Sequence, residues 1–304
     1  MERTISCSAG YFLRENWAKE PTAIDGECLY VIGGLYGNLY AAEEIHAMAR
    51  REAKAPAMVF NGDMHWFDCR YEDFSAVEEA TEGVKLLGNV EYELSSPLNK
   101  ADCGCNYPPD VDAGTVARSN QMHSMMKENL HGTNLLGTIA TRPMTAAFRI
   151  MGLTVAITHG DEKSMAGWGC DRTSLKRRGR REELGAWLRA NDVDILATTH
   201  TCLPAITTIG TSVVVNNGSA GMANVRGETF GLISRMGRMP HKDAVVSRKV
   251  KDLYVELVKV DFDGDAFLRH FDARWPKASP AHISYRDRIV GGTDLEIDEI
   301  DLDR

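Results

Sequence analysis

The chain has 304 residues, a mass of 33.6 kDa and a formal net charge of −8 at pH 7. This length allows one large domain with a substantial core, and the pI near 5.6 argues against nonspecific binding to nucleic acid or anionic membranes. A polar N-terminus, seven scattered cysteines and no apolar run of membrane-spanning length predict a cytoplasmic protein with reduced thiols.

The first third of the chain alternates apolar runs with helical patterns. Residues 28–33 (CLYVIG) and 57–60 (AMVF) are typical of buried strands, and Asn38 is placed to cap a helix between them. A helix near 73–82 and a strand at 84–87 repeat the order. This alternation predicts a parallel sheet whose functional residues follow the carboxyl ends of the strands.

The rest of the chain predicts a different arrangement. An inserted loop is expected around 95–115, because this segment is rich in Pro, Gly and Ser. Residues 1–292 are expected to form a single domain, and the acidic residues 293–304 a disordered tail. The remaining predicted elements are a helix at 115–130, a hairpin at 146–157, a helix through Leu184 and Leu188, a strand at 193–197, and consecutive antiparallel strands at 205–209, 213–215, 229–234 and 253–260.

Short polar motifs follow several of the predicted strands. In chain order they are residues 33–38 (GGLYGN), 61–63 (NGD), 88–91 (GNVE), 158–161 (THGD), 199–202 (THTC) and 217–219 (NGS). This ordered string resembles the calcineurin-like metallophosphoesterase superfamily over about residues 29–260. The resemblance implies an α/β fold, a four-layer α/β/β/α sandwich of two mixed sheets, with a site for two metal ions at one edge.

The resemblance also implies which residues bind metal. Members carry the patterns D-x-H, G-D-x-x-D, G-N-H-[DE], a lone H, and G-H-x-H. The carboxylate shared by the two cations corresponds to Asp63, and the other ligands of the second cation correspond to Asn89, His159 and His200. Any one of these residues alone is more often structural. Their joint presence in the expected order favours a metal site.

The ligands of the first cation are largely replaced. The D-x-H residues correspond to Gly34 and Tyr36, and the last His corresponds to Cys202. The His that acts near the leaving group corresponds to Val90, which cannot donate a proton. Because thiolates select softer ions, a rebuilt site that includes Cys202 is expected to hold one or two divalent or trivalent ions, Zn or Fe, with Mn as a further option.

Other polar and aromatic residues are candidates for supporting roles, each with a structural alternative such as helix capping, packing or a solvated helix face. Cys103 and Cys105 are either two unrelated thiols or, together with Cys202, part of a thiol-based metal or redox sensor. The candidates for proton transfer are His65 and Asp161, and those for substrate binding are Tyr36, Asn38, Trp168 and Arg172.

Two functions fit these motifs best. The leading hypothesis is a divergent metal-dependent phosphoesterase that uses metal-activated water to hydrolyse a phosphomonoester, a phosphodiester or a nucleotide. The alternative is a pseudoenzyme of the same fold that binds a ligand or a partner. The missing metal ligands at Gly34 and Tyr36 and the missing acid at Val90 favour the pseudoenzyme. The four retained ligands favour the phosphoesterase, because unused polar groups are costly to bury. The expected partner is a small phosphorylated substrate, without membrane or nucleic acid, and the oligomeric state is left open.

Overall fold

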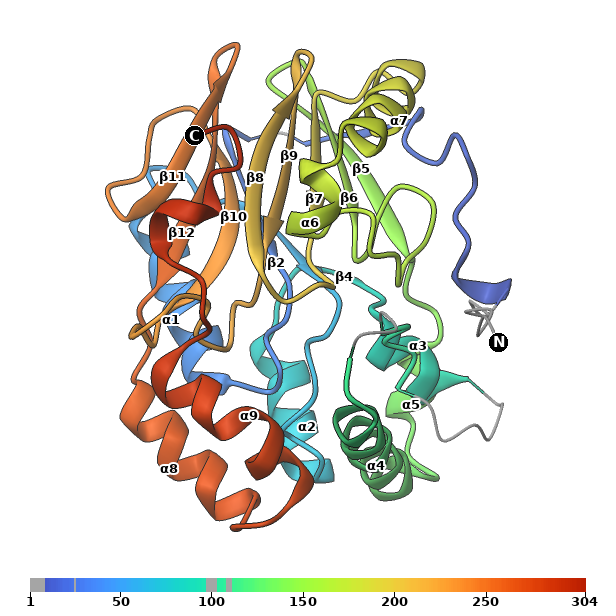
Figure 1. Ribbon diagram of the computed structural model, residues 1–304, viewed down its shortest axis with the longest axis vertical. Helices are drawn as coiled ribbons and strands as arrows, with labels where there is room; N and C mark the ends of the chain where they lie inside the picture. The colour runs from blue at the N-terminus through green and yellow to red at the C-terminus, as the bar shows by residue number, and fades with distance from the viewer. Residues whose placement is uncertain (1–8, 25, 97–102, 108–110) are drawn as a thin grey trace.

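The computed structural model describes residues 9–24, 26–96, 103–107 and 111–304. Two mixed β-sheets lie face to face, with helices on their outer sides (Figure 1). The strands are β1 (Thr22–Ala23), β2 (Cys28–Ile32), β3 (Ala57–Asn61), β4 (Val84–Leu86), β5 (Thr145–Ile150), β6 (Leu153–Thr158), β7 (Ile195–Thr198), β8 (Pro204–Ile209), β9 (Ser212–Asn217), β10 (Gly231–Gly237), β11 (Ala244–Val250) and β12 (Leu253–Val260). The helices are α1 (Leu39–Arg51), α2 (Tyr71–Ala80), α3 (Asn89–Ser95), α4 (Ala113–Leu130), α5 (Leu135–Ile139), α6 (Arg172–Lys176), α7 (Arg178–Ala190), α8 (Gly264–Arg274) and α9 (Pro280–Gly291), with 3-10 segments at Ala9–Tyr11 and Ile297–Ile300.

The layers follow from the apolar patterns of the strands. Along β2, Leu29 and Val31 face the second sheet, while Tyr30 and Ile32 face the helical layer that contains α1 and α8. Successive side chains of a strand point to opposite faces, so a strand buried on both faces is apolar throughout. On the far side of the other sheet, Leu184 of α7 belongs to a separate core cluster. The predicted four-layer α/β/β/α sandwich is confirmed.

The sheet topology brings several strand ends together. One sheet has the order β11-β12-β10-β2-β3-β4, in which β2, β3 and β4 are parallel. The other has the order β1-β5-β6-β7-β9-β8, in which β6, β7 and β9 are parallel. At the end of β3, Asn61 Nδ2 donates to the Thr158 carbonyl at 2.9 Å and to Thr199 Oγ1 at 3.0 Å. These bonds join the carboxyl ends of β3, β6 and β7 across the two sheets.

The second half of the chain differs in part from the sequence prediction. The hairpin between β5 and β6 is confirmed, with its turn at Met151 and Gly152. The later strands are not one antiparallel series: β8 pairs with β9 in one sheet, whereas β10, β11 and β12 belong to the other. The strand β11 and the helices α8 and α9 were not predicted.

The acidic tail was expected to be disordered, and the structure corrects this. Ile300 is fully buried, and Arg248 forms an ion pair with Asp301. Asp301 also makes a parallel bridge with Ile206 of β8. The charge of Asp301 is thus paired with a basic residue of β11, and this part of the tail packs against the protein.

The loop expected around 95–115 is only partly described, since residues 97–102 and 108–110 lie outside the described part of the chain. Residues 103–107 have no regular secondary structure, and α4 begins at Ala113. Among the described residues, no helix has both the length and the apolar character needed to cross a membrane.

Candidate metal site and adjoining cavity

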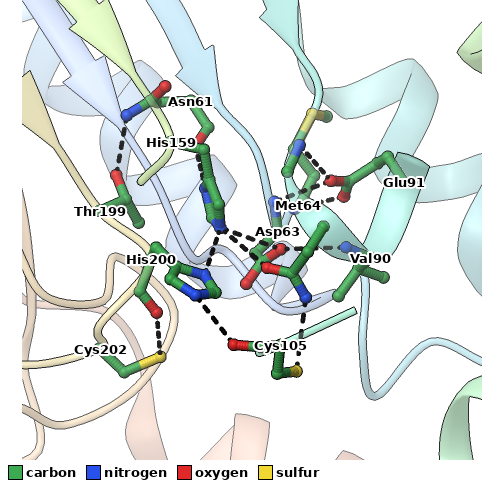
Figure 2. A network of polar contacts seen from close by, with 12 residues as sticks. Asn61, Asp63, Met64, Val90, Glu91, Cys105, His159, Thr199, His200 and Cys202 are labelled. Atoms are coloured by element: carbon green, nitrogen blue, oxygen red, sulfur yellow. Dashed lines mark hydrogen bonds and ion pairs between the residues drawn. The ribbon is translucent and has the colours of Figure 1, made fainter. Parts of the chain in front are cut away.

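Four polar side chains from four strand ends converge at the joined edge of the two sheets. Asp63 follows β3, Asn89 is the first residue of α3 after β4, and His159 and His200 follow β6 and β7. Ligand atoms of Asp63, His159 and His200 lie within 4.8 Å of one another, and Asn89 Oδ1 lies 3.2 Å from His159 Nε2 (Figure 2). The structure thus assembles the four residues that the resemblance implied as ligands of one cation.

The backbone of the turn after β3 lies very close to neighbouring residues. Gly62 has a φ of 75°, and a Cβ there would lie 2.5 Å from Gly88 Cα and 2.7 Å from His159 Nδ1. Asp63 itself has a φ of 51°, in the left-handed region that non-glycine residues seldom occupy. The Glu91 carboxylate holds this turn by accepting from three backbone N–H groups, those of Asp63 at 2.9 Å, Met64 at 2.8 Å and Gly88 at 2.9 Å (Figure 2).

The hydrogen bonds of His159 fix which nitrogen faces the cluster. Its Nδ1 lies 2.8 Å from the Asn61 carbonyl, which can only accept, so Nδ1 donates and the neutral ring carries a lone pair on Nε2. That Nε2 faces three other atoms: Asn89 Oδ1 at 3.2 Å, His200 Nδ1 at 3.2 Å and Asp63 Oδ1 at 3.4 Å.

A short loop orients two further members of the cluster. His200 Nε2 donates to the Cys105 carbonyl at 3.1 Å, which leaves a lone pair on Nδ1. Asn89 Nδ2 donates to the Cys103 carbonyl at 2.9 Å, so its Oδ1 faces His159. The Cys-Gly-Cys segment therefore contributes through its backbone, as the outer partners of metal ligands commonly do. The two thiols lie 2.8 Å from each other.

The donor set fits a cation. When both imidazoles are neutral, as metal binding requires, four lone-pair-bearing atoms face one another. Donor atoms about 3.4 Å apart are expected when a tetrahedral ion has bonds of about 2.0–2.1 Å, and the separations from His159 Nε2 are 3.2, 3.2 and 3.4 Å. Two nitrogens and two oxygens suit Zn, Fe or Mn.

Burial acts to lower the pKa of His159, but the neighbouring Asp63 raises it overall, so these two residues form an ion pair whose proton a bound cation would replace. Burial acts to raise the pKa of Asp63, but the neighbouring His159 lowers it overall, so the carboxylate is charged. Burial and the proximity of His159 lower the pKa of His200 to about 3, which leaves this imidazole neutral and able to bind metal.

Beside the cluster, the residues that replace the first-cation ligands pair with each other. Tyr36 Oη lies 2.7 Å from Cys202 Sγ, and both residues have left-handed backbones, with φ of 55° and 57°. Burial raises the pKa of both groups, which keeps the phenol and the thiol neutral. The sulfur is absent from the group of convergent ligand atoms among the described residues. This corrects the expectation that Cys202 is a metal ligand.

A cavity of about 200 Å³ adjoins the cluster. Residues outside the region of family resemblance supply part of its wall, above all the helix α9. The buried lining residues are Tyr36, Asp63, Trp66, Asn89, Val90, His200, Thr201 and Met222, and the half-buried ones are Cys105, Tyr107, Thr115, Trp168, Cys202, Ser284, Tyr285 and Arg288. Trp168, a candidate for substrate binding, lies in this wall with its ring 5.3 Å from that of His200.

His65, expected to transfer protons, has a structural environment instead. Its Nδ1 lies 2.6 Å from Asp68 Oδ2 and its Nε2 lies 2.8 Å from Glu78 Oε1, while its ring stacks on Phe74. Burial would lower its pKa, but the two carboxylates raise it to about 9. His65 is not among the residues that line the cavity, so the structure corrects the expectation of a catalytic role.

Three further candidates also have local structural roles and do not line the cavity. The Asp161 carboxylate accepts from the N–H groups of Lys163, Ser164 and Gly169, and organises its own loop. The Asn38 side chain caps α1 and donates to the Gly221 carbonyl. The Arg172 guanidinium donates to the Pro204 carbonyl at 3.0 Å. Burial and the adjacent Glu162 raise the pKa of Asp161, and burial lowers the pKa of Arg172.

The sequence analysis missed Arg288 and Tyr285, which lie in the cavity wall. Both belong to α9, whose start carries a recognisable signal. Ser279 caps the helix and Pro280 occupies its first turn, the usual place for proline. This signal predicts a helix, but nothing in the sequence indicates that its side chains reach a site formed by residues 63–202.

Comparisons with known proteins agree with this architecture at the level of fold. No protein-family model matches the sequence, and comparison with curated proteins finds no match. Among solved structures, a hypothetical protein of Pyrococcus horikoshii has a TM-score of 0.60 at 13% identity, covering 88% of this chain and 99% of that one. A metallophosphoesterase from Sphaerobacter thermophilus has a TM-score of 0.56 at 13% identity, covering 88% and 100%.

The fold is that of a metallophosphoesterase. Within this metallophosphoesterase fold, the convergent residues Asp63, His159 and His200 are a candidate metal-binding group. The low identity means that the likeness concerns architecture, while the chemistry of the site depends on the contacts within this chain.

Proposed function

We propose that the protein is a metal-dependent phosphoesterase that holds a single cation between Asp63, Asn89, His159 and His200. The observation that carries the proposal is the convergence of four acceptor atoms with separations of 3.2–3.4 Å from His159 Nε2. When bound, the cation would polarise a phosphoryl oxygen and make a water molecule more acidic.

The chain's own residues support this role in distinct ways. The carbonyl groups of Asn61 and Cys105 hold the two imidazoles with their lone pairs toward the cluster. Glu91 fixes the turn that carries Asp63. Trp168 and Tyr107 line the cavity, so part of its wall is aromatic and excludes water around a small phosphorylated substrate.

One cation is favoured over two because the place of the lost ligands is filled. Tyr36 and Cys202 satisfy each other with a 2.7 Å hydrogen bond and are neutral. A second cation beside them would have Asp63 as its only charged protein ligand among the residues that line the cavity.

The test is phosphate release by the metal-loaded protein. The wild type would be stripped with a chelator, reloaded separately with Zn, Fe(II) or Mn, and assayed against small phosphomonoesters and phosphodiesters. Activity is expected with at least one metal. It should be absent after chelation and in His200→Ala, and retained in the matched control Cys202→Ser. A protein that binds metal but releases no phosphate from any of these compounds would be a ligand-binding pseudoenzyme, and the proposal would be wrong.

A further inference from the structure

Arg288 is placed in the cavity wall without an acidic partner. Its Nε donates to the Ala223 carbonyl at 2.9 Å and its Nη2 to the Cys202 carbonyl at 2.7 Å. No ion pair joins it to a carboxylate of the described residues. On the same helix, Arg286 is bound by both oxygens of Asp272 at 2.9 and 3.0 Å. A guanidinium fixed in a cavity without a counterion is suited to bind an anion.

The guanidinium lies on the side of the cavity formed by Tyr36 and Cys202. It bonds to the backbone of Cys202, and its charge acts on both the Tyr36 phenol and the Cys202 thiol. Arg288 is the only Lys or Arg among the described residues that line the cavity. The same cavity is thus lined by the carboxylate of the candidate metal site and by a fixed positive charge, an arrangement suited to a phosphoryl group.

Aromatic side chains form much of the remaining wall. Trp66, Tyr107, Trp168 and Tyr285 line the cavity, together with apolar Val90 and Met222. The Trp168 indole N–H already donates to the Cys105 carbonyl at 3.1 Å, so this residue offers its ring to a ligand. Such walls favour an organic group with a flat, apolar face.

Outside the cluster, none of the described residues that line the cavity is suited to protonate a leaving oxygen. Apart from Asp63 and His200 of the metal cluster, the described lining residues include no carboxylic acid and no histidine. The remaining protons belong to hydroxyl, thiol, amide, indole and guanidinium groups, whose ordinary pKa values lie above about 8. The side chain at position 90 is that of valine. A leaving oxygen that receives no proton from these residues departs as an anion, which favours an acidic alcohol.

The volume sets a further limit on the ligand. Pockets for drug-sized ligands span about 300–1,000 Å³, whereas this cavity measures about 200 Å³. A phosphate with one small ring matches this size better than a nucleoside triphosphate or a protein segment.

We infer that the cavity binds a small aryl or enol phosphomonoester, with Arg288 holding the phosphoryl oxygens and the aromatic wall holding the organic group. This inference rests on the proposed phosphoesterase function and adds its substrate class. In the reaction, a water oxygen forms a bond to phosphorus and the bond to the leaving oxygen breaks with its electron pair. The phenolate or enolate takes a proton from solvent, and the products are the free alcohol and inorganic phosphate.

Binding of nonhydrolysable analogues tests the inference without activity. Titration calorimetry on the Zn-loaded protein would compare phenylphosphonate with methylphosphonate. Phenylphosphonate is expected to bind at least about tenfold more tightly, because the aromatic wall contacts its ring. Arg288→Met is expected to weaken phenylphosphonate binding at least about tenfold, while Arg288→Lys restores part of it. The matched control Arg286→Met, on the same helix, should bind like the wild type. Equal affinity for the two phosphonates, or unchanged affinity in Arg288→Met, would overturn the inference.

A leaving-group series gives a kinetic test that needs no variant. The rate constant should fall at least about 100-fold from 4-nitrophenyl phosphate to benzyl phosphate, because no acid assists the poorer leaving group. Equal rates for the two esters would overturn the inference and leave the phosphoesterase proposal intact. Tight phenylphosphonate binding without hydrolysis of either ester would defeat the proposed reaction and retain only the anion site.

Discussion

The two halves of the candidate site satisfy their polar groups in opposite ways. In the cluster of Asp63, Asn89, His159 and His200, lone pairs face one another, and outer partners hold them in that arrangement. In the neighbouring half, a donor meets an acceptor, since Tyr36 and Cys202 form a hydrogen bond. The first half presents atoms that a cation would bind, whereas the second is already hydrogen-bonded. Under the proposed function, the first half would hold the cation and the second would hold none.

The largest expected effect is a loss of metal affinity that occurs when a residue of the first half is replaced and not when one of the second half is. His159→Ala removes the nitrogen that faces all three other acceptor atoms, and should weaken metal binding more than about 100-fold. Cys202→Ser in the other half should stay within about threefold of the wild type. Competition with a chromophoric chelator measures both, and circular dichroism confirms that the variants are folded. Equal losses in the two variants would show that both halves bind metal.

His65 gives a pH-dependent test of the region behind the cluster. Its pKa is raised to about 9 by Asp68 and Glu78 despite burial, from an ordinary value of 6.5. A raised pKa stabilises the fold fully below about pH 6.5, and this contribution is lost as the pH rises through about 9. The free energy of unfolding of the wild type relative to His65→Gln should therefore fall over this window, by on the order of 3 kcal/mol. Urea titrations of both proteins at several pH values measure this difference. If the free energy of unfolding depended on pH in the same way in both proteins, the ion pairs of His65 with Asp68 and Glu78 would be refuted.

The smallest expected effect is on the free energy of unfolding, when the hydrogen bond between Tyr36 and Cys202 is removed. Tyr36→Phe removes the hydroxyl that bonds to Cys202 and should cost about 0.5–1.5 kcal/mol in the free energy of unfolding. Its metal stoichiometry should match that of the wild type, measured by elemental analysis after gel filtration. A loss of metal in this variant would mean that the phenol belongs to the metal site and that the two halves are not separate.

Local sequence signals predicted the strand ends well. Apolar runs identified the strands that precede Asp63, Asn89, His159 and His200, because strand and turn propensities depend on neighbouring residues, whereas the four-layer fold was implied by the resemblance. The resemblance supplied the ligand roles, and the structure shows the convergence of the four side chains.

Some errors occurred where a side chain's partner is distant in sequence, and others where nearby backbone groups bind a polar side chain. His65 lies between two carboxylates, and one of them, Glu78, comes from α2. Asn38 and Asp161 have polar side chains in suggestive motifs, yet nearby backbone groups account for most of their hydrogen bonds. Arg288 reaches the cavity from a C-terminal helix that no motif marks. Contacts of this kind depend on tertiary packing, which a single sequence does not reveal.

The most direct test of the one-cation site is an anomalous diffraction map from crystals of the zinc-loaded protein. The account predicts one peak, at bonding distance from Asp63, Asn89, His159 and His200, and no peak beside Cys202. Two peaks, or a single peak bound to the Cys202 sulfur, would contradict it.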